Sequence, residues 1–294
     1  MRLVYLGSPA AAVPPLHALV GAGHEVALVV TNPPRRRGRR SDPSPTPVGL
    51  AAEQLGLDVS YQAEDVLDAD AELGVVVAYG HIIGPEVLAR LRMVNLHFSL
   101  LPRWRGAAPV ERAILAGDSE TGVCVMEVEE GLDTGGVFAS TRVPIERGTT
   151  AAELRDQLVA EGSEMLVATL AAPLGEPTPQ ASEGVTYAEK LSSSDLQLQW
   201  ERSAAELVAM VMVGGAWTTL RGKRLKVLQA SAVDADVRDA SGAEFHPGEL
   251  VDEVVICGSG ALELEQLQPE GKAPMPALAF LNGARIDPGT RLGT

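Results

Sequence analysis

Residues 94–109 read Val94-Asn-Leu-His-Phe-Ser-Leu-Leu-Pro-Arg-Trp-Arg-Gly-Ala-Ala-Pro109, an apolar strand that runs into a polar loop. Asn95 and His97 are two residues apart, so on an extended strand their side chains leave the same face. An amide can donate to a developing oxyanion, and an imidazole can take up or relay a proton near neutral pH. The pair therefore indicates chemistry on a carbonyl group, with a structural histidine at a strand end as the commoner alternative.

Further apolar runs surround this strand. Residues 3–6, 25–30 and 73–78 are short and almost entirely apolar, and a helix of small residues separates the first two. Apolar strands that alternate with helices are typical of a parallel sheet covered on both faces. We predict a Rossmann-like α/β domain, in which ligands bind beyond the carboxyl ends of the strands. The turn Gly7-Ser-Pro9 lacks the G-x-G-x-x-G spacing, so the first turn does not indicate a nicotinamide or flavin cofactor.

The pattern changes in the last third of the chain. Strands are expected at 216–220, 225–228, 249–251, 254–257 and 262–267, with glycine-containing turns between them, which favours a small β-barrel. The proline-rich stretch from 172 to 179 indicates an interdomain linker. Ser203 and Glu206 form a capping box that begins a helix. We predict domains at 1–171 and 191–294, joined by a linker at 172–190.

Charge is distributed unevenly. The formal net charge of the 294 residues is -15, which argues against a protein coated for nonspecific nucleic-acid binding. Residues 31–47 are nevertheless rich in proline, lack apolar periodicity and are expected to form a mobile exposed loop. This loop contains five arginines, namely Arg35, Arg36, Arg37, Arg39 and Arg40. Such a group suits phosphate oxygens, although a charged run is often only a solvated face.

The cysteines and the first apolar run indicate the cellular compartment of the protein. Cys124 and Cys257 are far apart and provide neither a disulfide framework nor the usual spacing of metal ligands. The first apolar run stops at Gly7, well short of a signal peptide or a membrane span. We therefore expect a cytoplasmic protein without a bound metal and without a membrane partner.

Three motifs carry a family resemblance. Ser-Leu-Leu-Pro-Arg-Trp-Arg-Gly-Ala-Ala-Pro at 99–109, Met126 and Gly131-Leu-Asp-Thr-Gly135 resemble the 10-formyltetrahydrofolate-dependent formyltransferases, and among them the methionyl-tRNA formyltransferase family. The resemblance extends over essentially the full length. It implies transfer of a formyl group from 10-formyltetrahydrofolate to the α-amino group of methionyl-tRNA, the initiator tRNA. The family's catalytic residues fall on Asn95, His97 and Asp133.

The same resemblance implies where the substrates bind. The folate donor would be contacted by two loops, through Tyr79, Gly80, Ile82, Ser99, Leu100, Leu101 and Pro102. The arginine loop would reach the acceptor-stem end of the tRNA, and the second domain would be OB-like and help to hold tRNA. Its basic residues favour the hairpin at 221–226 as the RNA surface, through Arg221 and Lys223, with an ordinary solvated hairpin as the alternative. The linker would pass near the active site. We expect a monomer.

Two departures and three rivals remain. Phe98 stands where the family commonly has glycine, and Ser41 and Asp42 stand where lysines are common. A sugar-nucleotide N-formyltransferase or a formyltetrahydrofolate hydrolase would keep the same asparagine, histidine and aspartate. A tRNA-binding protein without catalysis is the rival from another class. The motif at 99–109, the arginine loop and the barrel-like second domain favour methionyl-tRNA over the sugar and hydrolase alternatives.

Overall fold

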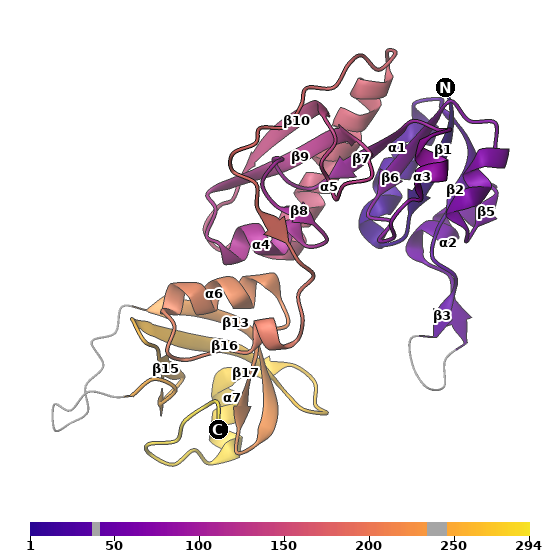
Figure 1. Ribbon diagram of the computed structural model, residues 1–294. Helices are drawn as coiled ribbons and strands as arrows, with labels where there is room; N and C mark the ends of the chain where they lie inside the picture. Colours follow the sequence, from indigo (N-terminus) through magenta and orange to yellow (C-terminus); the bar gives the residue numbers. More distant parts are fainter. Residues whose placement is uncertain (37–41, 234–245) are drawn as a thin grey trace. The chain divides into compact units, whose positions relative to one another are not determined.

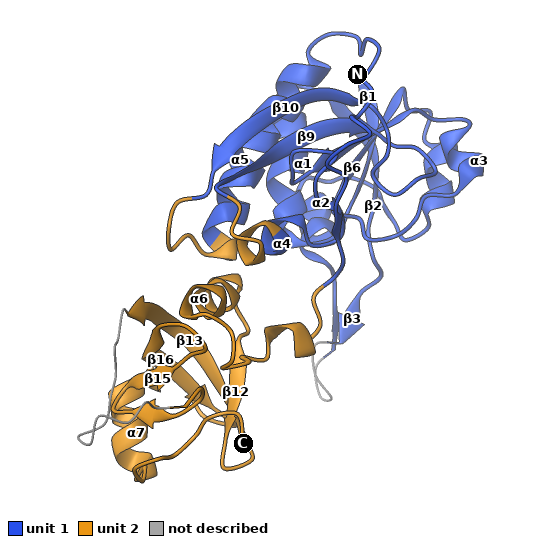
Figure 2. Ribbon diagram, turned by 60° about the vertical axis from the view of Figure 1, so that its left-hand side comes forward, with its two compact units in different colours: residues 1–112, 119–145, 153–190 blue, residues 113–118, 146–152, 191–294 orange. Residues whose placement is uncertain are grey.

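The computed structural model describes residues 1–36, 42–233 and 246–294. They divide into two compact units, coloured separately in Figure 2. The first unit holds Met1–Arg112, Ser119–Ile145 and Glu153–Lys190, and the second holds Ala113–Asp118, Glu146–Ala152 and Leu191–Thr294. Both units are therefore built from more than one stretch of chain.

A seven-stranded sheet forms the centre of the first unit, in the order β10-β9-β7-β6-β1-β2-β5 (Figure 1). Five strands are parallel: β1 (Arg2–Gly7), β2 (Glu25–Val30), β5 (Val59–Ser60), β6 (Leu73–Val77) and β7 (Met93–His97). Two antiparallel strands complete one edge, β9 (Glu120–Glu127) and β10 (Val137–Pro144). The predicted Rossmann-like domain is confirmed. The edge strand β10 was not predicted, because most of its residues are at least partly exposed and form no continuous apolar run.

Several helices that lie wholly or mostly in this unit begin where the sequence provides a start signal. Thr46 caps α2 (Pro47–Gln54) by accepting from the Gly49 N–H, and proline is the first residue of α2, α3 (Pro85–Leu88) and α4 (Pro109–Leu115). The remaining helices are α1 (Val13–Gly21), α5 (Ala151–Leu170) and the short η1 (Ala10–Ala12) and η2 (Ala63–Asp68). Every residue of β6 is buried, which requires cover on both faces of the sheet.

Strand order determines which loops share an edge. β7 lies between β6 and β9, with Asn95 opposite Val76 of β6 and His97 opposite Cys124 of β9. The chain leaves β6 after Val77 and β7 after His97, and because these strands are parallel both exits are at the same edge. The loops that begin at 78 and 98 are therefore neighbours at the carboxyl end of the sheet.

An antiparallel sheet forms the second unit, in the order β12-β13-β16-β15-β14. Its strands are β12 (Trp217–Leu220), β13 (Lys223–Val233), β14 (Leu250–Val251), β15 (Val254–Ile256) and β16 (Ala261–Pro269), and β17 (Met275–Pro276) pairs with β16. The described strands leave the sheet open, as in a partly open OB-like barrel. β13 is longer than the strand predicted at 225–228.

The core of this unit lies between the sheet and the helices α6 (Ala204–Val213) and α7 (Ala277–Ala284). The short η3 (Ser194–Leu196) has no buried residue. The predicted capping box begins α6, with the Ser203 hydroxyl and the Glu206 carboxylate each bonded to the other's backbone. Trp200 is 3% exposed, and its indole N–H donates to the hydroxyl of Thr218 at 3.2 Å. Across the described ranges, no helix is long and apolar enough to cross a membrane.

Candidate active site

His97, at the end of β7, contacts two groups through its two ring nitrogens. The residue is 5% exposed, and Nε2 lies 2.9 Å from the carbonyl oxygen of Trp104. A carbonyl oxygen only accepts, so Nε2 carries the hydrogen. Nδ1 faces Asp133, at 3.6 Å from its Oδ2. This distance is too long for a hydrogen bond but suits an ion pair when the ring is protonated.

A backbone N–H holds the carboxylate of Asp133. Gly106 donates to Asp133 Oδ2 at 2.7 Å, and the aspartate side chain is only 15% exposed. Gly106 has a φ of +120°, and a Cβ there would lie 2.8 Å from the carbonyl oxygen of Ala188. Only glycine fits this position without strain. The loop at 104–106 thus contacts the ring of His97 on one side and the carboxylate of Asp133 on the other.

Asn95 is half-buried and lies two residues before His97 on the same strand. Strand alternation puts the two side chains on one face of the sheet. The structure therefore places His97 beside Asp133 and an amide on the same face as the imidazole. An amide donor, an imidazole and a carboxylate in this arrangement can stabilise an oxyanion and move a proton.

The two predicted folate loops leave the sheet at the edge where His97 lies. Tyr79 is 6% exposed, Gly80 is exposed and Ile82 is 92% exposed. Burial, aided by the negative charge of Glu64, raises the pKa of the Tyr79 hydroxyl. Ser99 is fully buried, and its hydroxyl donates to the carbonyl of Arg103 at 2.6 Å. This hydroxyl therefore stabilises the loop itself. Leu100, Leu101 and Pro102 are half-buried and follow directly.

Residues of the segment at 172–190 bind the loop at 104–106 and the turn around Asp133. Thr186 accepts through its hydroxyl from the Trp104 N–H and through its carbonyl from the Arg105 N–H, both at 2.9 Å. The next residues form β11 (Tyr187–Ala188), which pairs in parallel with β8 (Arg105–Gly106). Gln180 contacts both Arg105 and the turn around Asp133. A glutamine in a proline-rich linker carries no sequence pattern that would have indicated this.

The arginine loop differs from its prediction at the base. β3 (Arg35–Arg36) and β4 (Pro43–Ser44) form a short antiparallel ribbon where an irregular loop was expected, because backbone pairing there does not depend on an apolar face. The side chains of Arg35 and Arg36 are exposed. Arg37, Arg39 and Arg40 lie outside the described residues.

The two predicted RNA contacts of the second unit, Arg221 and Lys223, differ in their surroundings. Lys223 is exposed, whereas the guanidinium of Arg221 donates to the carbonyls of Ala284 and Arg285 at 3.1 and 2.9 Å, at the end of α7. Cations at a helix carboxyl end satisfy its free carbonyls. Arg221 therefore has a structural contact within its own unit. Its neighbour Arg224 lies over the ring of Trp217, 4.1 Å from the centroid.

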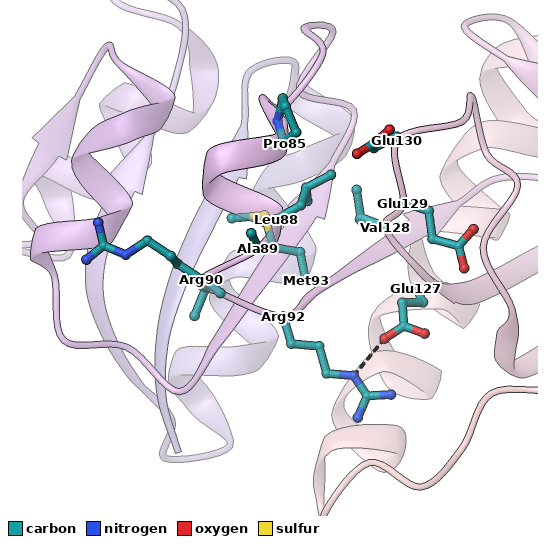
Figure 3. Close-up of a pocket in the computed structure, with 11 residues that line it drawn as sticks. Pro85, Leu88, Ala89, Arg90, Arg92, Met93, Glu127, Val128, Glu129 and Glu130 are labelled. Carbon is teal, nitrogen blue, oxygen red and sulfur yellow. Dashed lines mark hydrogen bonds and ion pairs between the residues drawn. The ribbon is translucent and has the colours of Figure 1, made fainter.

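A cavity of about 570 Å³ lies apart from these residues, between α3, the start of β7 and the end of β9 (Figure 3). Arg92 and Glu127 form an ion pair of 2.8 Å on its wall, and Arg90 points away from the acidic side chains. Its lining does not include Asn95, His97 or Asp133. Within the described ranges, no group of three or more histidine, cysteine, aspartate or glutamate side chains is placed to hold a metal ion.

Comparison with known proteins decides the family. The profile described as "Formyl transferase" matches residues 1–170, and "Formyl transferase, C-terminal domain" matches residues 190–285. A methionyl-tRNA formyltransferase of Ruegeria pomeroyi is 43% identical, over 99% of this chain and 100% of its own. That of Roseobacter denitrificans is 44% identical, over 99% and 98%. The chain belongs to the methionyl-tRNA formyltransferase family.

Solved structures share the fold of this family member at low identity. The N-formyltransferase of Helicobacter canadensis, in complex with folinic acid and dTDP-3-aminofucose, superposes with a TM-score of 0.67 at 15% identity, over 90% of this chain and 99% of its own. HypX of Aquifex aeolicus, in complex with tetrahydrofolic acid, gives a TM-score of 0.62 at 18% identity, over 96% and 47%. At these identities the likeness concerns the fold alone.

Proposed function

We propose that the protein transfers the formyl group of 10-formyltetrahydrofolate to the α-amino group of methionyl initiator tRNA, for translation initiation. The observation that supports this most directly is the His97 and Asp133 pair, 3.6 Å apart at the carboxyl end of β7, in a chain 43% identical to a methionyl-tRNA formyltransferase along nearly its full length. The pair supplies the chemistry, and the relatives indicate the acceptor.

The proposed reaction is an acyl transfer. The neutral amine of the methionyl group attacks the formyl carbon, a C–N bond forms, and the former carbonyl oxygen becomes an oxyanion. The Asn95 amide and the His97 ring stabilise that oxyanion. When the intermediate collapses, the bond from the carbon to the folate nitrogen breaks, and the proton lost by the amine is delivered to that nitrogen. The products are formylmethionyl-tRNA and tetrahydrofolate.

The hydrogen bond to Trp104 assigns roles to the ring nitrogens. Because Nε2 donates to that carbonyl, Nδ1 is the nitrogen that would serve the reacting groups. Asp133, beside Nδ1, would balance positive charge on the ring or accept a proton in passing. The ring orientation is fixed by the Trp104 carbonyl, so Asp133 would act through its charge more than as the group that orients the ring.

The remaining parts of the proposal concern the partners. Residues 1–171 would form the catalytic domain, and residues 191–294 would help to hold the tRNA. The exposed Arg35 and Arg36, with Arg37, Arg39 and Arg40 beyond the described residues, would contact phosphates near the acceptor-stem end. The loops at 79–82 and 99–102 would line the folate site. We expect a monomer that works in the cytoplasm.

A formyl donor labelled at the formyl carbon tests this proposal against its rivals. The protein is incubated with the donor and, in separate reactions, methionyl initiator tRNA, methionyl elongator tRNA, a dTDP-amino sugar or no acceptor. We expect label on the initiator tRNA. Label on the sugar would support a sugar-nucleotide N-formyltransferase, and labelled formate without an acceptor would support a hydrolase. Tight tRNA binding without any label transfer would support a binding protein and would overturn the proposal.

A further inference from the structure

We propose that Gln180 is a positioning residue, whose side-chain amide holds the turn that carries Asp133 in register with the loop that contacts His97. The proposal deepens the function proposed above, because it rests on Asp133 and His97 being the reacting groups. Gln180 lies in the segment predicted as an interdomain linker that passes near the active site, and most residues around it are exposed.

All the hydrogen-bonding capacity of the Gln180 amide is used. Oε1 accepts from the guanidinium of Arg105, from Nε at 3.1 Å and from Nη2 at 2.7 Å. Nε2 donates to the carbonyl of Asp133 at 2.8 Å and to that of Gly135 at 2.7 Å. A guanidinium only donates and carbonyls only accept, so these partners also fix which end of the amide is oxygen.

The turn around Asp133 needs such support. Asp133 has a φ of +50°, a conformation that costs a residue other than glycine about 1–3 kcal/mol unless its surroundings enforce it. Gly131, Leu132 and Thr134 are exposed, so packing of side chains does little to hold this turn. The two donations from Gln180 grip it through the carbonyls on either side of Thr134.

The other contact of Gln180 reaches the opposing loop. Arg105 lies between Trp104, whose carbonyl binds the His97 ring, and Gly106, whose N–H binds the Asp133 carboxylate. One amide therefore bridges the backbone that carries the carboxylate and the loop that aligns both groups.

The position of Gln180 itself is fixed on both sides. Thr178 exchanges two backbone hydrogen bonds with Val137, at 2.8 and 2.9 Å. Further along, Thr186 and β11 bind the loop at 104–106. These contacts before and after Gln180 fix its backbone, so its side chain can hold the turn around Asp133 in place. The sub-ångström placement of reacting groups governs rate strongly, so a loosened turn should lower turnover.

Three variants separate the contact of Gln180 with Arg105 from its contact with the Asp133 turn. Gln180→Met removes all four hydrogen bonds at similar side-chain size. Gln180→Glu keeps an acceptor for Arg105 but cannot donate to the two carbonyls, and Arg105→Met removes only the guanidinium. If the grip on the Asp133 turn is what matters, Gln180→Met and Gln180→Glu lower kcat by about 10- to 100-fold with the KM for the formyl donor nearly unchanged. Arg105→Met has a smaller effect. Gln157→Met, at an exposed position of α5, is the matched control and leaves kcat unchanged.

A double-mutant cycle tests whether Gln180 acts through Asp133. In an Asp133→Ala background, Gln180→Met should cause little further loss of kcat, because the group it positions is gone. A second loss as large as the first would overturn the proposal. Normal kcat in both Gln180 variants would overturn it as well.

Hydrogen exchange provides a readout that does not depend on activity. The Gly106 N–H is protected by the Asp133 carboxylate, so its exchange rate should rise at least about 10-fold in Gln180→Met and stay unchanged in Gln157→Met. If the wild type transfers no formyl group but the Gly106 N–H exchanges faster in Gln180→Met, the proposed function is rejected and the positioning of the Asp133 turn by Gln180 stands. An active wild type with unchanged Gly106 exchange in Gln180→Met would reject the positioning role alone.

Discussion

The Nε2 atom of His97 lies 2.9 Å from the carbonyl oxygen of Trp104, a contact between a ring and a backbone group seven residues further along the chain. The contact fixes both the orientation of the ring and the nitrogen that carries its hydrogen. Trp104 itself has a φ of +65°, and its N–H is held by Thr186. The imidazole is therefore aligned by the main chain of a loop that the linker segment supports.

Loss of either member of the facing pair should abolish most turnover. We expect His97→Ala and Asp133→Ala to lower kcat about 100- to 1000-fold, because each removes a group that stabilises charge in the transition state, while binding of the folate donor persists. Steady-state formyl transfer and donor binding by calorimetry measure the two effects. Asp156→Ala, at an exposed position of α5, is the control. Near-normal turnover in both active-site variants would contradict the assignment.

The two described arginines of the ribbon should affect tRNA and not the donor. Replacing Arg35 and Arg36 together by alanine should raise the KM for tRNA severalfold and make binding less dependent on salt, since fewer phosphates are neutralised. The KM for the formyl donor should not change. Arg90→Ala removes an exposed arginine at another place on the same unit and should leave the salt dependence as it is. An unchanged salt slope in the double variant would count against the ribbon as a tRNA contact.

Gly106→Ala should damage both folding and turnover. The added methyl group would lie 2.8 Å from the Ala188 carbonyl, in a conformation with φ of +120° that alanine avoids. We expect the free energy of unfolding to fall by the conformational cost of about 1–3 kcal/mol and by a further amount from the collision, together with a large fall in kcat. Gly56→Ala, where φ is +69° and the space is open, reports the conformational cost without the collision. Equal effects of the two substitutions would show that the approach of Ala188 is unimportant.

The buried hydrogen bond of the second unit should contribute to its stability. Thr218→Val is nearly isosteric and leaves the indole N–H of Trp200 without its acceptor, at a site with no exposure. We expect a loss of about 1–3 kcal/mol in the free energy of unfolding, measured by denaturant titration. Thr219→Val, the next residue on β12, is half-buried and should change stability much less. A neutral Thr218→Val would mean that the bond adds nothing to the fold.

The capping box should make the second unit sensitive to acid. Hydrogen bonds from the Ser203 hydroxyl and backbone N–H lower the pKa of Glu206 below its ordinary value. A carboxyl group whose pKa is lowered by folding adds stability above its unfolded pKa, and this stability is lost as the pH falls through the lowered pKa. Glu206→Gln should therefore reduce the urea midpoint at pH 7 more than at pH 3. An equal reduction at both pH values would exclude a contribution from the charge.

Local patterns in the sequence determined much of the fold and part of the site. The apolar runs predicted β1, β2, β6 and β7, and Ser203 with Glu206 predicted the start of α6. The period of two along a strand also put Asn95 and His97 on one face. These features depend on neighbours within a few residues, so they can be inferred from spacing alone.

Tertiary structure alone decided how the site is assembled. No sequence spacing relates Asp133 to His97. Trp104 contributes its backbone carbonyl, which the identity of its side chain does not indicate. Gln180 lies in a segment without periodicity. The pairing of β8 with β11 and that of β7 with β9 likewise join stretches that are distant in the chain. Such contacts form when separate elements pack together and their buried backbone groups require hydrogen-bond partners. The local sequence pattern does not specify which distant groups become those partners.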